Sequence, residues 1–319
     1  MSAPRPTQRS GLVLPILLAL AALAGAVIVS QRLMGRRAPW TPLHAAPTQR
    51  TEAAAVGSPA DDPGTFQVTA ATGLVEAERD GRWTAIKNGD TLTRADVVRT
   101  AAGARAVLQL SAGTEIELRE RVEIGLDRLA SGPTVDLRRG KVLARVSGAE
   151  ALAITSHETR TANEGPAHFV VLSDSQGRVS VATLSGSARF VAGGKAVVLP
   201  TGTQSSSERG AAPGDPERIP EEVLLEVVWP VGEQRHATDH SEIHGRAAPS
   251  SVVTVNGSVA AVGVDGHFTT AVPLREGKNP VAVEVEDLSG RTRQAATTVM
   301  RHGPPQPALT PETTDLWKK

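Results

Sequence analysis

The sequence predicts an all-β chain in which a larger and a smaller sandwich domain follow one N-terminal transmembrane helix. Three observations predict this fold class. Short apolar stretches that alternate with polar residues recur between residues 65 and 301, and turn dipeptides separate them. No stretch in that region keeps a helical period beyond about two turns. Residues 11–29 carry no charge, and as a helix they would be about 28 Å long, enough to cross the hydrocarbon layer.

The composition of the 319-residue chain excludes several functional classes. Lys plus Arg and Asp plus Glu both number 34, so the formal net charge is zero. We expect no nucleic-acid partner, because a sequence-independent binder needs a basic surface. The absence of Cys excludes disulfides, Cys-ligated zinc and Cys nucleophiles. With no Tyr, four Phe and four Trp, few residues could stack on bases or sugars.

The apolar stretch at residues 11–29 determines the expected compartment. It is an uncleaved membrane anchor, a signal peptide cut after Ala22, Ala24 or Ala26, or a buried core helix, which the long polar, Pro-rich stretch after it disfavours. Residues 27–29 extend the apolar run beyond those alanines, which favours the anchor. We expect a single-pass protein of the inner (cytoplasmic) membrane, with residues 1–10 as a short cytoplasmic tail and the bulk of the chain in the periplasm. The alternative is a secreted or periplasmic protein after cleavage.

Three polar segments without an apolar period divide the rest of the chain. Residues 30–64 are rich in Pro and Ala and predict a flexible spacer. Residues 202–221 are rich in Ser, Gly and Pro and predict a linker. Residues 302–319 form a Pro-rich polar tail that we expect to be disordered.

Residues 65–201 predict the larger domain, a β-sandwich or jelly roll. Asp80-Gly81 lies between extended flanks and predicts a hairpin turn. Ile116 and Leu118 alternate with glutamates, which places the two apolar residues on one face of a strand. Gly193-Gly194 predicts the turn of the last hairpin. Further strands are predicted at residues 66–69, 106–110, 141–146, 169–172 and 178–182.

Residues 222–301 predict a smaller sandwich. Asn256-Gly257 between two Val-rich stretches is the clearest hairpin signal in the chain. Val281, Val283 and Val285 alternate with small or acidic residues, as in a half-buried strand. About seven short strands with regularly spaced turns fit an immunoglobulin-like sandwich.

An ordered set of glycine turns and apolar strand positions runs through the larger domain. It consists of Gly73-Leu74-Val75, Trp83, Gly89-Asp90, and residues 97–100 (VVRT), 104–110 (ARAVLQL), 113–118 (GTEIEL), 137–142 (LRRGKV), 154–156 (ITS) and 177–181 (GRVSV). In this order the elements resemble the FecR domain, the periplasmic part of iron-citrate-type signal regulators. The resemblance implies a domain that senses a signal or binds a partner.

The chain departs from the FecR pattern at two places. Where the family usually carries Gly-Thr-x-Phe, residues 165–169 read GPAHF, and we expect Phe169 to be the packed aromatic residue. Family members that bind a sigma factor carry a cytoplasmic helical domain before the membrane helix. The ten residues before Gly11 are too few to fold as such a domain. The resemblance therefore implies the sensing half without the sigma-factor-binding half.

A second ordered set lies in the smaller domain. It comprises residues 244–247 (HGRA), 253–257 (VTVNG), 264–268 (VDGHF), 272–274 (VPL), 277–281 (GKNPV) and 286–290 (EDLSG). This set is similar to the immunoglobulin-like modules of bacterial cell-envelope and carbohydrate-active proteins. The resemblance implies a spacer or a binding platform without catalytic residues.

We predict no catalytic, cofactor-binding or metal-ligating residues. His236, His240 and His244 lie four residues apart, so a helix would stack their imidazoles, whereas a strand would place His240, Glu242 and His244 on one face. This spacing matches no established zinc pattern and favours a solvated loop and strand edge. Asp80 precedes a turn glycine, which explains its carboxylate without catalysis.

Two charge clusters and two tryptophans complete the candidate residues. Residues 119–121 (RER) and Arg138-Arg139 predict solvated strand edges; the alternative is a binding patch for anionic envelope polymers. Trp83 and Trp229 lie beside predicted strands, and we expect both to be packed.

These observations predict a non-enzymatic, membrane-anchored envelope protein. It would recognise a protein or ligand in the periplasm through exposed strand edges and loops, in a signalling role, and contact the inner membrane through residues 11–29. The alternative is an envelope scaffold that binds peptidoglycan or another polysaccharide, although aromatic residues are scarce. We expect no cofactor.

Overall fold

The computed structural model describes residues 65–129, 132–230 and 239–302, and all of them belong to one compact unit. Every regular element in these ranges is a strand, which confirms the all-β class. None of the described segments forms a helix that is long and apolar enough to cross a membrane. The predicted membrane segment at residues 11–29, the spacer at residues 30–64 and residues 303–319 of the predicted tail lie outside the described residues.

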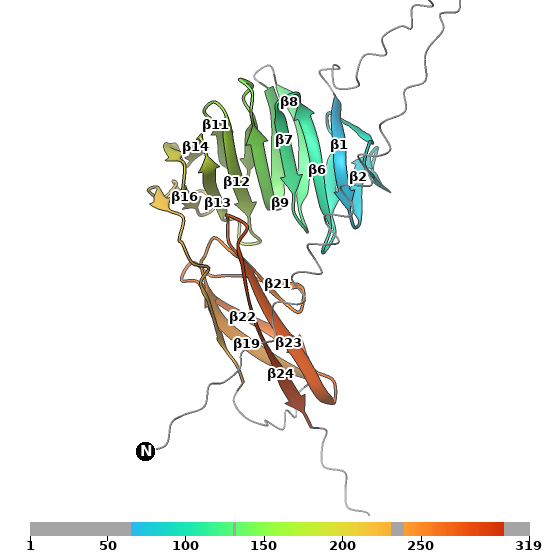
Figure 1. The fold of residues 1–319 in the computed structure, drawn as a ribbon, viewed down its shortest axis with the longest axis vertical. Coiled ribbons are helices and arrows are strands. Elements are labelled where there is room, and N and C mark those ends of the chain that lie inside the picture. Colours follow the sequence, from blue (N-terminus) through green and yellow to red (C-terminus); the bar gives the residue numbers. More distant parts are fainter. Residues whose placement is uncertain (1–64, 130–131, 231–238, 303–319) are drawn as a thin grey trace, which may run out of the picture. The chain divides into compact units, whose positions relative to one another are not determined.

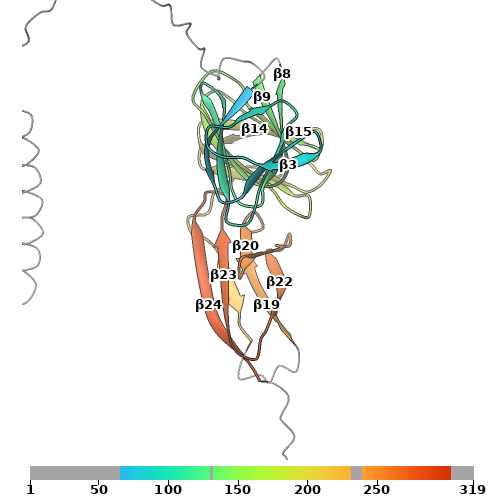
Figure 2. The same cartoon turned by 90° about the vertical axis from the view of Figure 1, so that its right-hand side faces the viewer.

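The larger domain, the first sandwich, consists of two open β-layers (Figures 1 and 2). Layer A has the strand order β4-β1-β6-β7-β9-β12-β13-β16-β17. Layer B has the order β3-β2-β5-β8-β9-β10-β11-β14-β15. The strands are β1 (Thr65–Thr72), β2 (Val75–Arg79), β3 (Arg82–Ala85), β4 (Thr91–Thr93), β5 (Val97–Thr100), β6 (Arg105–Ser111), β7 (Thr114–Leu118), β8 (Glu123–Leu129), β9 (Gly132–Val146), β10 (Ala153–Ser156), β11 (Thr159–Asn163), β12 (Ala167–Ser173), β13 (Val179–Ser185), β14 (Ser187–Ala192), β15 (Lys195–Pro200), β16 (Thr203–Ser207) and β17 (Glu217–Arg218).

Strand β9 belongs to both layers and joins them. Its residues up to Arg139 pair with β8 in layer B, and its residues from Gly140 onward pair with β12 in layer A. Gly140 has a φ of +92°, and a Cβ atom at this position would lie 2.8 Å from Val122 Cα. Only glycine fits this close approach without strain, so Gly140 allows the strand to pass from one layer to the other.

The core lies between the two layers, and the alternation in the sequence predicts which residues enter it. Ile116 and Leu118 are fully buried, whereas the glutamates between and beside them are half-buried on the other face of β7. Phe169 is also fully buried, as predicted. The predicted turn at Asp80-Gly81 connects β2 with β3, and both residues have positive φ, as a tight hairpin turn requires.

The structure differs from the predicted linker at residues 202–221. Residues 203–207 form β16, which pairs with β13 and extends layer A. Ser205 and Ser207 are buried, and their hydroxyls donate to the carbonyl oxygens of Gly214 and Ala211. Backbone pairing and local hydroxyl bonds stabilise this strand, so it lacks the apolar alternation by which strands are predicted.

The smaller domain, the second sandwich, has a three-stranded sheet, β18-β19-β22, and a four-stranded sheet, β21-β20-β23-β24. Val281, Val283 and Val285 of β23 are buried, as predicted. The predicted turn at Asn256-Gly257 connects β20 with β21, and its φ values are +48° and +77°. The strands are β18 (Leu225–Val228), β19 (His240–Ala247), β20 (Val252–Val255), β21 (Ser258–Ala260), β22 (His267–Pro273), β23 (Gly277–Glu286) and β24 (Thr292–Arg301). The sandwich is confirmed; its immunoglobulin-like character stays a prediction.

Candidate functional site

The outer face of layer A carries an apolar patch that the second sandwich covers. Along β12, Phe169 and Val171 belong to the main core of the first sandwich. Val170 and Leu172 therefore lie on the opposite face, yet they are only 0% and 5% exposed. They form a separate apolar cluster with Leu288, which lies between β23 and β24 and is 1% exposed. Burial of this apolar surface favours association of the two sandwiches.

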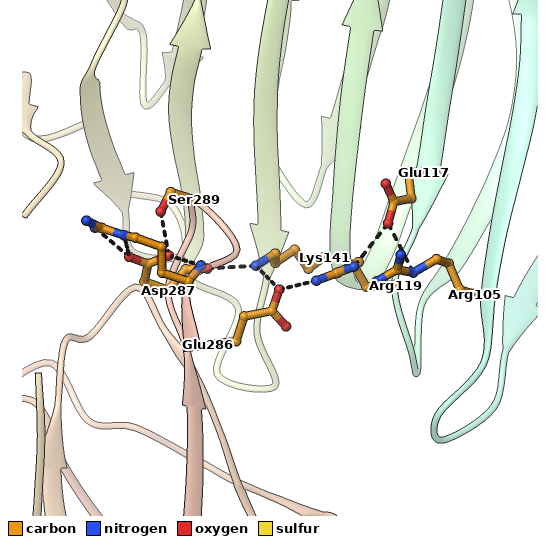
Figure 3. Close-up of polar contacts among 8 residues, drawn as sticks. Arg105, Glu117, Arg119, Lys141, Glu286, Asp287 and Ser289 are labelled. Carbon is orange, nitrogen blue, oxygen red and sulfur yellow. Dashed lines mark hydrogen bonds and ion pairs between the residues drawn. The ribbon is translucent and has the colours of Figure 1, made fainter. Parts of the chain in front are cut away.

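Beside the apolar cluster, Glu286 of the second sandwich pairs with two cations of the first (Figure 3). Its Oε1 lies 2.8 Å from Lys141 Nζ and 2.6 Å from Arg119 Nη2. Lys141 Nζ also donates to the carbonyl oxygen of Asp287 at 2.7 Å. The Lys141 side chain is 3% exposed, whereas Arg119 and Glu286 are 20% and 22% exposed. The ammonium group is thus enclosed, and both of its hydrogen-bond partners belong to the second sandwich.

Glu117 extends this group of charges along layer A. Its Oε1 lies 3.1 Å from both Arg119 Nη1 and Arg105 Nε (Figure 3). We call Glu117, Arg119, Lys141 and Glu286 the interdomain ion cluster. Within it, each carboxylate contacts a guanidinium or ammonium group at hydrogen-bond distance.

Local structure fixes the position of each charge in the cluster. Lys141 follows Gly140 at the bend of β9, and Arg119 follows the last residue of β7. Glu286 is the last residue of β23, and Asp287 begins the turn into β24. Asp287 Oδ1 accepts hydrogen bonds from Ser289 Oγ at 2.7 Å and from the Arg291 backbone N–H at 2.9 Å. These bonds hold the turn that carries both Glu286 and Leu288.

In the interdomain ion cluster, burial and neighbouring opposite charges shift the pKa values in opposite directions. Burial lowers the pKa of Lys141 below its ordinary value of 10.5, although Glu286 favours the ammonium form. Burial also raises the pKa of Glu286, but Lys141 and Arg119 outweigh burial and bring it below 4.5. For Glu117 burial prevails, and its pKa is raised above 4.5. Glu286 is therefore ionised at neutral pH and supplies the counter-charge that Lys141 requires.

Two further arginines of the first sandwich donate to backbone carbonyls of the second. Arg178, whose side chain is 3% exposed, donates to Pro249 O at 2.8 Å and pairs with Glu208 at 2.6 Å. Arg121 donates to Gly257 O. The contact therefore combines one apolar cluster with cations that point from the first sandwich to acceptors on the second.

Two cavities lie at this contact. One has a volume of about 400 Å³, and its lining combines charged residues, among them Arg105, Glu120 and Glu284, with small or apolar ones. The other has a volume of about 230 Å³ and a mainly apolar lining that includes Leu172 and Val259. Within the part of the chain that the structure describes, no three His, Asp or Glu side chains lie together as metal ligands would.

The structure corrects the prediction for residues 119–121. These residues were expected to form a solvated strand edge, but Arg119 pairs with Glu286 and Arg121 donates to Gly257 O. The alternation of residues along one strand shows only which of its faces is buried by its own domain, whereas Arg119 and Arg121 face a second domain. Arg138 and Arg139 remain largely exposed and share the carboxylate of Glu123.

The structure also places the predicted histidines. His240, Glu242 and His244 lie on the exposed face of β19, so the strand interpretation is confirmed and the helical one is wrong. His244 Nε2 lies 3.6 Å from Glu242 Oε2, and its Nδ1 lies 3.0 Å from Thr269 Oγ1. His236 lies outside the described residues.

Trp83 and Trp229 are each half-buried. Trp229 packs against the core of the second sandwich, and the Arg99 guanidinium lies 3.8 Å from the centre of the Trp83 ring. The predicted packing of both tryptophans is therefore partial, because each ring keeps part of its surface in solvent.

No local sequence pattern marks Lys141, Glu286 or Leu288 as contact residues. One signal was present: residues 169–172 (FVVL) form an unbroken apolar run. Such a run is typical of a strand that is buried on both faces, so a partner for the outer face could have been inferred. The ion pairs that this partner contributes could not have been inferred, because Lys141 lies 145 residues from Glu286 in the sequence.

Comparisons with known proteins give one family-model match in each domain. The FecR protein family matches residues 96–189, which confirms a FecR domain in the first sandwich. Glucodextranase, domain B matches residues 230–302, which include most of the second sandwich. The immunoglobulin-like resemblance is therefore not confirmed. No curated protein matches the chain.

The solved structures resemble the chain only weakly. Two crystal structures of a Parabacteroides distasonis protein described as an anti-sigma factor align over 38% of this chain, at 12% and 11% identity and a TM-score of 0.34 each. The chain covers 59% of that protein's length. A polysaccharide lyase aligns over 75% of this chain and 40% of its own, at 10% identity and a TM-score of 0.18.

Proposed function

We propose that this chain is a non-enzymatic, membrane-anchored envelope protein whose two sandwiches together recognise a protein or ligand in the periplasm, in a signalling role. Residues 11–29 would anchor it in the inner membrane. The FecR match at residues 96–189 is the observation that carries the proposal. The resemblance to FecR regulators implies that this domain lies in the periplasm.

The contact between the sandwiches supports recognition by both domains together. Lys141 and Arg119 bind Glu286, and Leu288 completes an apolar cluster on layer A. A partner that touches both sandwiches would therefore meet surfaces whose relative position is already fixed, which reduces the entropy lost on binding. The proposal of a non-enzymatic role rests on the sequence, which has no Cys and no Gly-x-Ser-x-Gly motif.

Fractionation tests the location. Cells that express the full chain with a C-terminal tag are separated into soluble and membrane fractions, the membranes are washed with carbonate, and the mass of the protein is measured. We expect the full mass in the washed membranes, and digestion by protease that is added to spheroplasts. A protein that stays in the cytoplasmic fraction overturns the proposal, whereas a shortened periplasmic form supports only the signal-peptide alternative.

Photo-crosslinking tests the recognition. A photoreactive residue is placed in vivo at Val198 of the first sandwich or at Val264 of the second, which are 42% and 69% exposed. We expect a discrete, light-dependent adduct of constant mass from at least one of these positions. If neither position, nor its exposed neighbours, gives an adduct, a stable partner is excluded for these surfaces.

A second candidate function is carbohydrate binding, and the match of residues 230–302 to glucodextranase domain B favours it. In this case the second sandwich would hold the protein on peptidoglycan or another polysaccharide. Sedimentation with purified peptidoglycan distinguishes the two functions. A protein that pellets only with the polymer supports the scaffold function. A protein that stays in the supernatant excludes binding to peptidoglycan.

A further inference from the structure

The smaller of the two cavities has an apolar floor. It lies where the end of β12 approaches the hairpin of β20 and β21, and its volume is about 230 Å³. Leu172, Val252, Val259, Ala260 and Val262 contribute aliphatic side chains to its lining. At about 30 Å³ for each water-sized group, the cavity holds roughly eight such groups, which suits one aliphatic side chain and a carboxylate.

The charged residues of the lining favour an anion. Arg121 and Arg139 belong to the lining, and Asp174 is its one acidic member among the described residues. Arg121 already pairs with Glu120 at 2.9 Å and donates to Gly257 O, so Arg139 is the cation available to an anion. Asp174 Oδ1 already accepts the backbone N–H groups of Gln176 and Arg178. Arg139 pairs with Glu123 through Nη2 at 3.0 Å, and its side chain remains 63% exposed. Its other guanidinium N–H groups can therefore turn toward a carboxylate in the cavity.

A sheet edge borders the same cavity. Within the described chain, β21 lies at the edge of its four-stranded sheet and pairs with β20. The two-residue turn at Asn256-Gly257 makes Val255 and Ser258 a hydrogen-bonded pair, so the backbone N–H and C=O of Val259 point away from β20. Val259 is 51% exposed and lines the cavity. An extended peptide could bind these two groups as an added strand.

We propose that this cavity binds the C-terminal residue of a partner protein. An aliphatic last side chain would pack against the apolar lining, the terminal carboxylate would bind Arg139, and the peptide backbone would pair with Val259. The inference rests on the proposed function, because it names the chemistry of the partner. The edge strand favours a peptide over a free fatty acid, since a fatty acid cannot pair with the backbone of β21.

Paired peptide arrays test the inference. The full chain is applied to hexapeptides whose last two positions are varied, each made with a free C-terminal carboxylate and with a carboxamide. Dissociation constants of the strongest binders are then measured by fluorescence polarisation. We expect binding to peptides that end in Val, Leu or Ile, weakened about tenfold or more in the carboxamides because a charge-assisted hydrogen bond is lost.

Matched variants assign the binding to this cavity. Arg139→Ala should weaken it about tenfold, whereas Arg138→Ala should not, because Arg138 shares the partner Glu123 but does not line the cavity. Ala261→Phe should block binding, since Ala261 is an exposed lining residue whose replacement fills the space without disturbing the core.

Two results overturn the inference. One is an array in which no peptide binds better as the carboxylate than as the carboxamide. The other is carboxylate-dependent binding that Arg139→Ala and Ala261→Phe leave unchanged. If the photo-crosslinked adduct of the full chain survives both substitutions, the proposed function stands while this inference fails.

Discussion

Replacing Glu286 with Gln removes the counter-charge of the buried ammonium and nearly preserves the shape of the side chain. In the variant, Lys141 Nζ keeps its hydrogen bond to Asp287 O but faces Arg119 without a carboxylate between them. Arg119 retains Glu117 at 3.1 Å, so the unpaired charge is that of Lys141. The perturbation thus leaves a single cation enclosed in the contact between the sandwiches.

The structure sets the size of the expected effect. Breaking a buried ion pair by removing one partner costs about 3–5 kcal/mol. Lys141 is 3% exposed, but Glu286 is 22% exposed, so solvent partly screens the site. One hydrogen bond of the ammonium also remains. We therefore expect Glu286→Gln to lower the free energy of unfolding by about 3 kcal/mol, at the lower end of that range.

Urea unfolding followed by tryptophan fluorescence measures this loss, because Trp83 reports on the first sandwich and Trp229 on the second. Glu284→Gln is the matched control: Glu284 lies on the same face of β23, and its carboxylate accepts from Gln294 at 2.9 Å. We expect the control to change the free energy by no more than about 0.5 kcal/mol. Equal unfolding free energies for Glu286→Gln and the control would refute the reasoning.

A double substitution separates the unpaired charge from the lost pair. If the penalty of Glu286→Gln arises from the enclosed ammonium, replacing Lys141 with Met and Glu286 with Leu together should restore most of the lost stability. Buried ion pairs exchanged for apolar residues of similar volume are often neutral or stabilising. If the double variant is as unstable as Glu286→Gln, the charge is not the cause and the effect lies in packing.

Three further outcomes follow from the same structure. The pKa of Glu286 is lower in the folded protein than its ordinary 4.5, so its ionised form stabilises the fold above about pH 4.5, and this contribution is lost as the pH falls through the lowered value. The unfolding free energy of the wild type should therefore fall more steeply below pH 4.5 than that of Glu286→Gln, and parallel curves would contradict this. Leu288→Ala should cost about 2–3 kcal/mol in urea unfolding, because Leu288 is 1% exposed within an apolar cluster. Gly140→Ala should cost about 2 kcal/mol or more and lower the melting temperature measured by circular dichroism, because of its φ of +92° and the contact with Val122; an unchanged melting temperature would show that β9 can shift there.

Hairpin turns and the buried faces of strands could be predicted because each depends on only a few consecutive residues. Turn dipeptides at Asp80-Gly81 and Asn256-Gly257 fixed two hairpins, and alternation in β7 and β23 fixed the buried faces. These features depend on neighbouring residues, so the sequence contains enough information to predict them. Strand β16 was missed because its buried side chains are hydroxyl and amide groups.

The contact between the sandwiches could not be predicted in the same way. The doubly buried β12 carries a sequence signal, but nothing near Lys141 indicates that Glu286 will reach it. Long-range pairing of charges depends on the docking of two complete domains, and charged residues on strands are usually solvated. The same reason explains why Arg119 and Arg121 were predicted to lie at a solvated edge.

The two parts of the contact have different physical consequences. The apolar cluster around Leu288 gains free energy from the area it buries, and this gain depends little on direction. The interdomain ion cluster depends on direction, because Lys141 Nζ must lie 2.8 Å from Glu286 Oε1 and 2.7 Å from Asp287 O at the same time. Because an enclosed ammonium without these acceptors is unfavourable, other orientations of the second sandwich on layer A are penalised. Apolar burial thus favours association, while the ion cluster selects one orientation, which also determines the shape of the cavity beside β21.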